Sequence, residues 1–263
     1  MKNSFDQQKI SAIREGGKKL AAVKHLLVEH THPGVHFEEL EKIAWDEIIR
    51  LGAKPSFPTV DGYKYATCIT KNEGCCHGVP VGKTVEDGDV ITLDLGLIWN
   101  GYHTDTTETV YVHEKKKADP KIEEFLRVGR LALDKAISKA QVGNSVWDIS
   151  HAIEKTISEH GYEAVYQLTG HAVGKHLHED PQIPCVAYRS DKKIPLVEGM
   201  TLAIEPMYAM GNARLVLGGD GWTYETADKS LTGMFEDTVI VTSGEPEIVT
   251  RVPNPILEET ASL

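Results

Sequence analysis

The sequence predicts an α+β fold, an antiparallel sheet with helices on its outer face. Two amphipathic helical stretches open each half of the chain, and strand-like apolar runs follow each pair. Between two of these runs, Asn100-Gly101 is a strong signal for a two-residue hairpin turn. Since the halves, about 6–112 and 119–245, repeat this order, we expect a single domain over 1–263 with a central cleft where they meet.

The first half is expected to begin with a helix over 6–30, which has apolar residues near one face. Pro33-Gly34 breaks this helix, and a second one is expected from about Val35 to Leu51, with Gly52 just past its end. Strands are expected near 65–71, 89–99 and 102–112.

The second half is expected to follow the same plan. Asp119-Pro120 opens a helix that runs to about Gln141, with proline at the first helical position. Ser145 and Asp148 have the spacing of a helix start, and that helix is expected to run to His160. Strands are expected near 163–169, 200–209, 222–226 and 235–242.

Equal spacing supports an internal repeat. Gly34 and Gly52 are eighteen positions apart, and so are Gly143 and Gly161. Apolar residues match at the same offsets from the first glycine of each pair: Phe37 with Val146, Leu40 with Ile149, Ala44 with Ile153, and Ile48 with Ile157. Chance similarity stays an alternative, because the helical period forces some agreement between any two amphipathic helices.

Composition narrows the class of protein. The net charge of −11 argues against a broad nucleic-acid surface, and no apolar run has the length of a membrane span. The charged N-terminal segment lacks the apolar core of a secretion signal. The four cysteines, Cys68, Cys75, Cys76 and Cys185, are expected to be reduced thiols. We therefore expect a cytoplasmic protein without nucleic-acid or membrane partners.

Two aspartates occupy unusual positions in the predicted hairpin. If Asn100-Gly101 forms the turn, Asp94 faces Thr107, and Asp105 faces Gly96. Residues two apart on a strand share a face, so both carboxylates would lie on one side, with Cα atoms roughly 7–8 Å apart. Two carboxylates that converge on an apolar strand pair repel one another. Either one carboxylate takes a proton or cations lie between them.

Further ligand-type residues occur in later apolar runs. Glu205 lies in "TLAIEPM", Glu236 in "GMFEDTVIVT", and His171, His176 and His178 in "LTGHAVGKHLHED". Four carboxylates and an imidazole suit a pair of divalent ions such as Mn, Fe or Co. Each residue alone also fits an ordinary place at a strand end or in a loop.

The motifs that contain these residues resemble those of a known family. "DLGLIWNGYHTDTTETV", "GHAVGKHLHE", "AIEPM" and "FEDTVIVT", together with "NEGCCHGVP", are similar to segments of the type I, bacterial methionine aminopeptidases. The resemblance covers nearly the whole chain. It implies the duplicated pita-bread fold of these metallopeptidases, with a dinuclear metal site in the central cleft.

The resemblance also implies roles for individual residues. The metal ligands would be Asp94, Asp105, His171, Glu205 and Glu236, which would hold two divalent ions (Co, Mn, Fe or Zn) with Asp105 and Glu236 as bridges. A hydroxide between the metals would attack the first peptide bond. Glu205 would move the proton, while His77 and His178 would contact the substrate and take part in catalysis. Tyr63, Tyr65, Cys68 and Trp222 would form the pocket for the methionine side chain, although ordinary core packing suits them equally well.

The expected function is removal of the N-terminal methionine from peptides and nascent chains, with a preference for a small second residue. We expect a monomer with transient ribosome contact. The alternatives are an Xaa-Pro aminopeptidase-like enzyme and a metal-free, peptide-binding member of the same fold. Three positions depart from the family pattern without removing a ligand: Ala172, Leu177 and Met234.

Overall fold

The computed structural model describes residues 7–251, and the predicted helix start at residue 6 lies outside this range. The helices are α1 (Gln7–His30), α2 (Phe37–Arg50), α3 (Pro120–Ile137) and α4 (Val146–Glu159). Two short 3-10 helices, η1 (Phe57–Thr59) and η2 (Arg189–Lys193), lie in loops. All four predicted helices are therefore present.

The predicted start signals act as expected at α3 and α4. The Asp119 carboxylate accepts a hydrogen bond from the Lys121 backbone N–H, and Pro120 is the first residue of α3. The Ser145 backbone N–H donates to Asp148 Oδ2 at 2.8 Å ahead of α4. The prediction for the end of α3 was wrong, because the helix stops at Ile137 instead of running to residue 141. Beyond it the chain bonds to the segment that follows β14, where the Val142 N–H donates to the Thr242 carbonyl.

Within residues 7–251, the main sheet has nine strands, all paired antiparallel, in the order β1-β4-β5-β14-β9-β7-β8, with β2 paired to β4 and β15 to β14. Its strands are β1 (Lys54–Pro55), β2 (Thr67–Lys71), β4 (Val90–Trp99), β5 (Tyr102–Tyr111), β7 (Thr169–Ala172), β8 (Glu179–Pro184), β9 (Thr201–Ile204), β14 (Glu236–Ile240) and β15 (Glu247–Ile248). Two three-stranded sheets accompany it. One contains β6 (Glu163–Ala164), β10 (Met207–Ala209) and β13 (Thr232–Met234), and the other β3 (Gly74–Cys76), β11 (Leu215–Leu217) and β12 (Tyr224–Thr226).

The strands of the second half differ most from the prediction. The expected strand over 163–169 is instead two short strands in different sheets, β6 and β7. The expected strand over 200–209 is broken at Glu205-Pro206, since proline has no N–H to give to a ladder. The strands that were not predicted are β1, β3, β8, β11, β13 and β15.

The predicted hairpin register is confirmed. Asn100 and Gly101 have φ values of 50° and 81°, the left-handed pair that this two-residue turn requires. Asp94 pairs with Thr107, and Gly96 pairs with Asp105. The two aspartates therefore lie on the same face of the sheet.

The two halves match in the details of their helices. All eight apolar residues matched between α2 and α4 are buried. The glycines that flank these helices also correspond, with φ values of 97° and 99° at Gly34 and Gly143 and of 75° and 80° at Gly52 and Gly161. The single-domain organisation over 1–263 stays a prediction.

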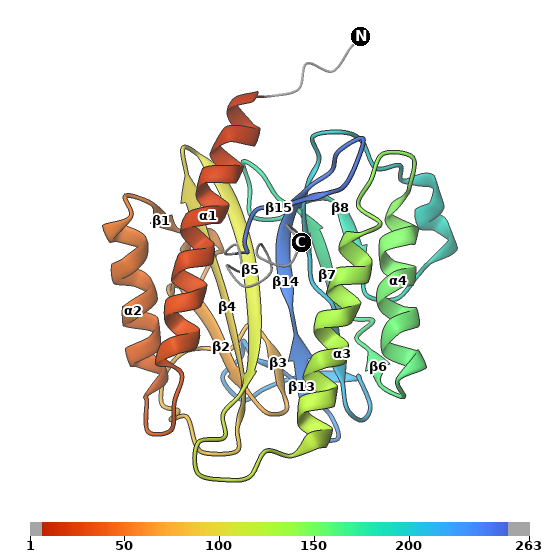
Figure 1. The fold of residues 1–263 in the computed structure, drawn as a ribbon. Coiled ribbons are helices and arrows are strands. Elements are labelled where there is room, and N and C mark those ends of the chain that lie inside the picture. The colour runs from red at the N-terminus through yellow and green to blue at the C-terminus, as the bar shows by residue number, and fades with distance from the viewer. Residues whose placement is uncertain (1–6, 252–263) are drawn as a thin grey trace, which may run out of the picture.

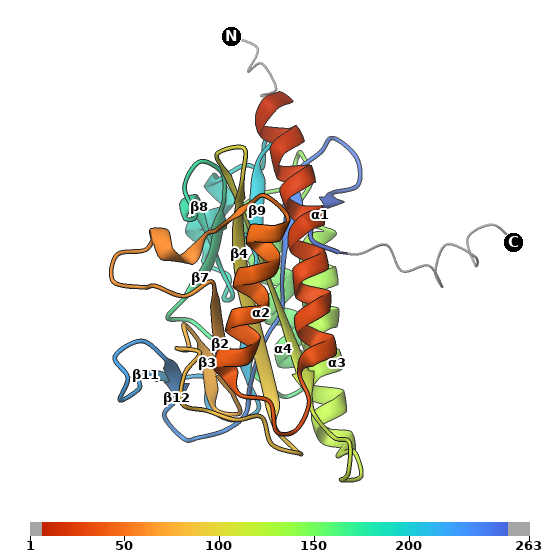
Figure 2. The ribbon, with the colours of Figure 1, turned by 90° about the vertical axis from the view of Figure 1, so that its left-hand side faces the viewer.

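The helices cover one face of the main sheet, with α1 and α2 over one half and α3 and α4 over the other (Figure 1). Figure 2 shows this helical layer edge-on, with the small sheet of β3, β11 and β12 on the opposite side. Strands β5 and β14 meet between the halves through only two Cα pairs, Glu236 with Thr107 and Asp237 with Thr106. Within 7–251, no helix is long and apolar enough to cross a membrane.

Candidate metal centre

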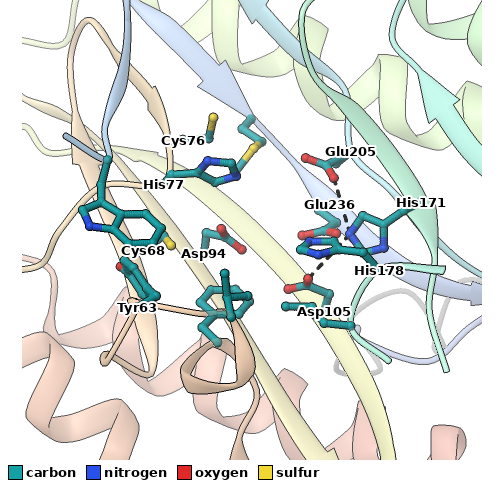
Figure 3. Close-up of a pocket in the computed structure, with 15 residues that line it drawn as sticks. Tyr63, Cys68, Cys76, His77, Asp94, Asp105, His171, His178, Glu205 and Glu236 are labelled. Carbon is teal, nitrogen blue, oxygen red and sulfur yellow. Dashed lines mark ion pairs between the residues drawn. The ribbon is translucent and has the colours of Figure 1, made fainter. Parts of the chain in front are cut away.

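The five predicted metal ligands line one pocket on the sheet face opposite the helices. Asp94 comes from β4, Asp105 from β5, His171 from β7 and Glu236 from β14, while Glu205 lies at the break between β9 and β10. Figure 3 shows these side chains pointing toward one another. The sheet therefore gathers residues that are up to 142 positions apart in the sequence (236 minus 94).

The distances within the cluster are those of groups that could share an ion. His171 Nε2 lies 3.9 Å from Asp105 Oδ2 and 3.8 Å from Glu205 Oε1. Ligand atoms of Asp105, His171 and Glu236 all lie within 4.8 Å of one another. The Thr107 hydroxyl is 3.0 Å from Asp94 Oδ1 and 2.9 Å from Glu236 Oε2, although its single proton can serve only one of them at a time.

Burial makes the carboxylates of this cluster costly as free anions. It raises the pKa of Asp94 to about 7, and together with the neighbouring carboxylates it raises the pKa values of Asp105, Glu205 and Glu236 well above their ordinary values. Burial, with a smaller contribution from His178, lowers the pKa of His171 to about 4. A neutral imidazole is the form that binds a metal.

The residues fit bound divalent ions. Glu236 Oε1 is buried and has no hydrogen-bond partner among residues 7–251, which is costly unless something else satisfies it. No lysine or arginine of the described chain lines the pocket, so no side-chain cation offsets the carboxylates there. Carboxylate oxygens with one imidazole nitrogen are donors that suit Mn, Fe and Co.

The two predicted substrate histidines lie at the open side of the same pocket. His77 and His178 both line the pocket and are exposed. The His178 ring stands edge-on to His171, with centroids 4.5 Å apart, and the His77 ring packs against Tyr224 at 5.7 Å. His77 has a φ of 55°, a left-handed conformation just after β3. His176, the third histidine of its motif, is exposed and does not line the pocket.

An apolar wall adjoins the carboxylates. Tyr63, Cys68 and Trp222 line it, and the ring centroids of Tyr63 and Trp222 are 5.0 Å apart. Their role in binding the methionine side chain stays a prediction. Tyr65 does not line the pocket, because it packs edge-on against Tyr63 at 5.5 Å, with Lys64 over its ring. The role of Tyr65 in binding the methionine side chain stays a prediction.

The sequence prediction missed other side chains of this wall: Phe57, Val60, Cys76, Leu177 and Met234. Phe57 begins a 3-10 turn, and Leu177 lies in a loop, so neither belongs to a periodic pattern. Leu177 and Met234 are two of the positions that depart from the family pattern. Leu177 and Met234 could have been predicted to line the pocket, because they lie one residue before His178 and two residues before Glu236.

Comparison with known proteins decides the family. Residues 11–243 match the model of metallopeptidase family M24. The chain belongs to this family. A methionine aminopeptidase of Aquifex aeolicus is 38% identical to it over 256 residues, which cover 94% of this chain and 98% of the relative. The crystal structure of a methionine aminopeptidase from Thermotoga maritima is 36% identical, has a TM-score of 0.89, and is matched over 94% of this chain and 98% of that one.

The predicted pita-bread fold is thereby confirmed. An X-Pro aminopeptidase from Thermotoga maritima is 23% identical with a TM-score of 0.72, and the match covers 94% of this chain but 62% of that one. At this identity the similarity concerns the fold alone.

Proposed function

We propose that this protein is a metal-dependent aminopeptidase that removes the N-terminal methionine from peptides and nascent proteins, preferring a small second residue. The observation that carries this proposal is the pocket in which the five ligand-type residues adjoin an apolar, sulfur- and aromatic-lined wall. The methionine aminopeptidases matched over 98% of their lengths support it.

Two divalent ions would be held by Asp94, Asp105, His171, Glu205 and Glu236. The donor set accepts Co, Mn, Fe or Zn. When bound, such ions activate water and polarise the carbonyl of the first peptide bond.

The side chains of the cleft supply proton transfer and contacts with the substrate. Glu205 would accept a proton from the attacking water and pass it to the leaving amine. His178 donates to the developing negative charge on the carbonyl oxygen, and His77 holds the amide of the second residue. Both histidines are exposed at the open side of the cleft, where substrate can reach them.

The apolar wall supplies the preference for methionine. Tyr63, Cys68 and Trp222 offer aromatic faces and a soft sulfur, which suit a thioether side chain. The Tyr63 hydroxyl is already used, since its single proton is donated to the carbonyl of Thr67 at 2.7 Å or to that of Gly78 at 3.0 Å. Tyr65 packs edge-on against Tyr63, with ring centroids 5.5 Å apart.

The same proposal includes a cytoplasmic location, a monomer of one domain and transient contact with the ribosome. Four buried, free cysteines support a reducing compartment. A monomer is supported because one chain supplies every residue of the cleft. Nascent chains as substrates are the reason to include the ribosome among the partners.

Peptide cleavage tests this function directly. Met-Ala-Ser, Ala-Ala-Ser and Met-Pro-containing peptides would be incubated with the protein, with Mn or Co added and then removed by a chelator. We expect release of methionine only where a small residue follows it, and loss of activity after chelation. Cleavage confined to the bond before proline would favour an Xaa-Pro enzyme. Peptide binding without turnover at any metal concentration would favour a metal-free binding protein.

A further inference from the structure

On the sheet face opposite the metal cleft, a buried ionic network lies directly behind Glu236. Asp237, the next residue, is fully buried and points toward the helices. Lys24 Nζ from α1 lies 3.5 Å from Asp237 Oδ1, and Arg251 Nε lies 2.5 Å from Asp237 Oδ2. Arg251 also pairs with Asp134 of α3 at 2.7 Å. The network therefore joins α1, β14 and α3 across the boundary between the two halves.

One branch of this network reaches the backbone of Glu236. Lys24 Nζ donates to Thr106 Oγ1 at 2.7 Å, and the Thr106 hydroxyl donates to the Glu236 carbonyl at 2.8 Å. The directions are fixed, because an ammonium can only donate and the hydroxyl has one proton. The Thr106 backbone N–H also donates to Asp105 Oδ1 at 3.0 Å. Thr106 thus contacts both of the proposed bridging residues.

A second branch reaches the backbone of Asp105. Thr250 Oγ1 donates to Asp237 Oδ1 at 2.9 Å and accepts from the Thr238 N–H at 3.0 Å. The Thr238 hydroxyl donates to the Asp105 carbonyl at 2.7 Å and accepts from the Asp105 N–H at 3.0 Å. Both branches begin at Asp237.

The place of these contacts in the sheet gives them their importance. Strands β5 and β14 pair through only two Cα positions, so a short backbone ladder holds Asp105 and Glu236 across the boundary between the halves. Hydrogen bonds between buried polar groups restrict the geometry of the groups that they join. We propose that Lys24, Thr106 and Asp237 are positioning residues that fix the separation of Asp105 and Glu236 and thereby set the metal affinity of the cleft.

The proposal rests on the proposed function, because it takes Asp105 and Glu236 as metal ligands. Partners behind metal ligands typically change metal affinity by about 10- to 100-fold when they are removed. We therefore expect Thr106→Val, which removes the hydroxyl and keeps the shape, to weaken Mn²⁺ binding by about tenfold. Thr106→Ser, which restores the hydroxyl, should recover most of the affinity.

Thr104→Val is the matched control. Thr104 lies two residues earlier on β5, so it shares the face of Thr106, and it is equally buried. Its hydroxyl has no hydrogen-bond partner among the described residues. The control therefore makes the same chemical change in the same strand without touching the network.

The experiment titrates Mn²⁺ into chelator-treated wild type, Thr106→Val, Thr106→Ser and Thr104→Val by calorimetry. The visible spectrum of each Co²⁺-loaded protein reports the ligand geometry, and thermal unfolding without metal reports stability. Weaker Mn²⁺ binding and an altered Co²⁺ spectrum in Thr106→Val alone would support the proposal. Equal affinity and equal spectra in the two valine variants would overturn it, even if Thr106→Val unfolds at a lower temperature.

A variant that does not fold and a failure of the proposed function can both be distinguished from a failure of this inference. If Thr106→Val does not fold, Lys24→Met replaces it, since Arg251 still pairs with Asp237 in that variant. Unchanged Mn²⁺ affinity in Lys24→Met would then overturn the proposal. If the wild type binds Mn²⁺ and cleaves Met-Ala-Ser while Thr106→Val matches it, only this inference fails. If the wild type binds no divalent metal, the proposed function fails and this inference fails with it.

Discussion

Glu236 and Asp237 are neighbours in one strand, yet their carboxylates meet opposite surroundings. Glu236 faces the cleft, where Asp94, Asp105 and Glu205 also converge. Burial, with a further contribution from the charge of Asp94, raises its pKa well above the ordinary value. Asp237 faces the helices, where burial alone would raise its pKa, but the charges of Lys24, Arg251 and Arg130 lower it. The helix face of the sheet contains its own cations, whereas the cleft face requires cations from solution.

The largest expected effect is the loss of a ligand from the cleft face. Asp105→Ala should reduce turnover of Met-Ala-Ser by about a thousandfold or more, because water is no longer activated by the paired ions. The variant should still fold, since one repulsive carboxylate is removed from the metal-free cluster. Steady-state kinetics and circular dichroism measure the two parts. Normal turnover would show that the ligand assignment is incorrect.

The next effect is the stabilisation of the cleft face by metal. A ligand present at about 1,000 times its Kd stabilises the folded state by about 4 kcal/mol, which should raise the Tm of a chain of this size by about 10 °C. Thermal unfolding with added Mn²⁺ and with chelator measures the shift. If Mn, Co, Fe and Zn leave the Tm unchanged at every concentration, the cleft face does not bind cations from solution, contrary to the account above.

Matched substitutions on the two faces should have opposite effects on the metal-free protein. Asp237→Asn leaves buried Lys24 without its charged partner and should lower the free energy of unfolding by about 3 kcal/mol. Glu236→Gln relieves repulsion and should raise that free energy. Urea unfolding in the presence of chelator measures both variants. Effects of the same sign would mean that the two faces do not differ as described.

The smallest effect is a pH dependence of the cleft face. The pKa of Asp94 is about 7 in the folded protein against 3.8 in the unfolded chain, so the folded state holds this proton more tightly. Its stabilising contribution is complete below pH 3.8 and is lost as the pH rises through 7. Between pH 6 and 8, metal-free wild type should lose about 1 kcal/mol relative to Asp94→Asn.

Urea unfolding at several pH values, with chelator present, tests this difference. Histidine titration is common to both proteins and cancels in the comparison. Metal-loaded protein should instead gain stability as the pH rises over this range, because protons compete with metal for the carboxylates. A difference between wild type and Asp94→Asn that is independent of pH would contradict the raised pKa.

The first half of the chain was the more predictable from sequence, for a physical reason. A two-residue turn fixes the register of both long strands, so Asn100-Gly101 alone places Asp94 and Asp105 on one face. In the second half, the helix starts were also predictable, because Asp119 and Ser145 act through contacts with residues two or three positions away.

The rest depends on contacts between distant residues. Strands β7 and β8 are short and pair with an irregular register near His171, so period-two alternation is too brief to be read. Phe57 and Leu177 reach the apolar wall from loops, where side-chain direction has no sequence period. Lys24 lies four residues after buried Leu20, so its place on the apolar side of α1 follows from helical spacing. Its partner Asp237 does not follow from any local pattern, because it lies 213 positions away.

The central claim is that divalent ions neutralise the buried carboxylates of the cleft. Calorimetric titration of Mn²⁺ or Co²⁺ into chelator-treated protein tests it most directly, with elemental analysis of the product and with Asp105→Ala in parallel. We predict that the wild type takes up two ions per chain and that Asp105→Ala takes up fewer than two. No uptake by the wild type, or equal uptake by the two proteins, would contradict the account.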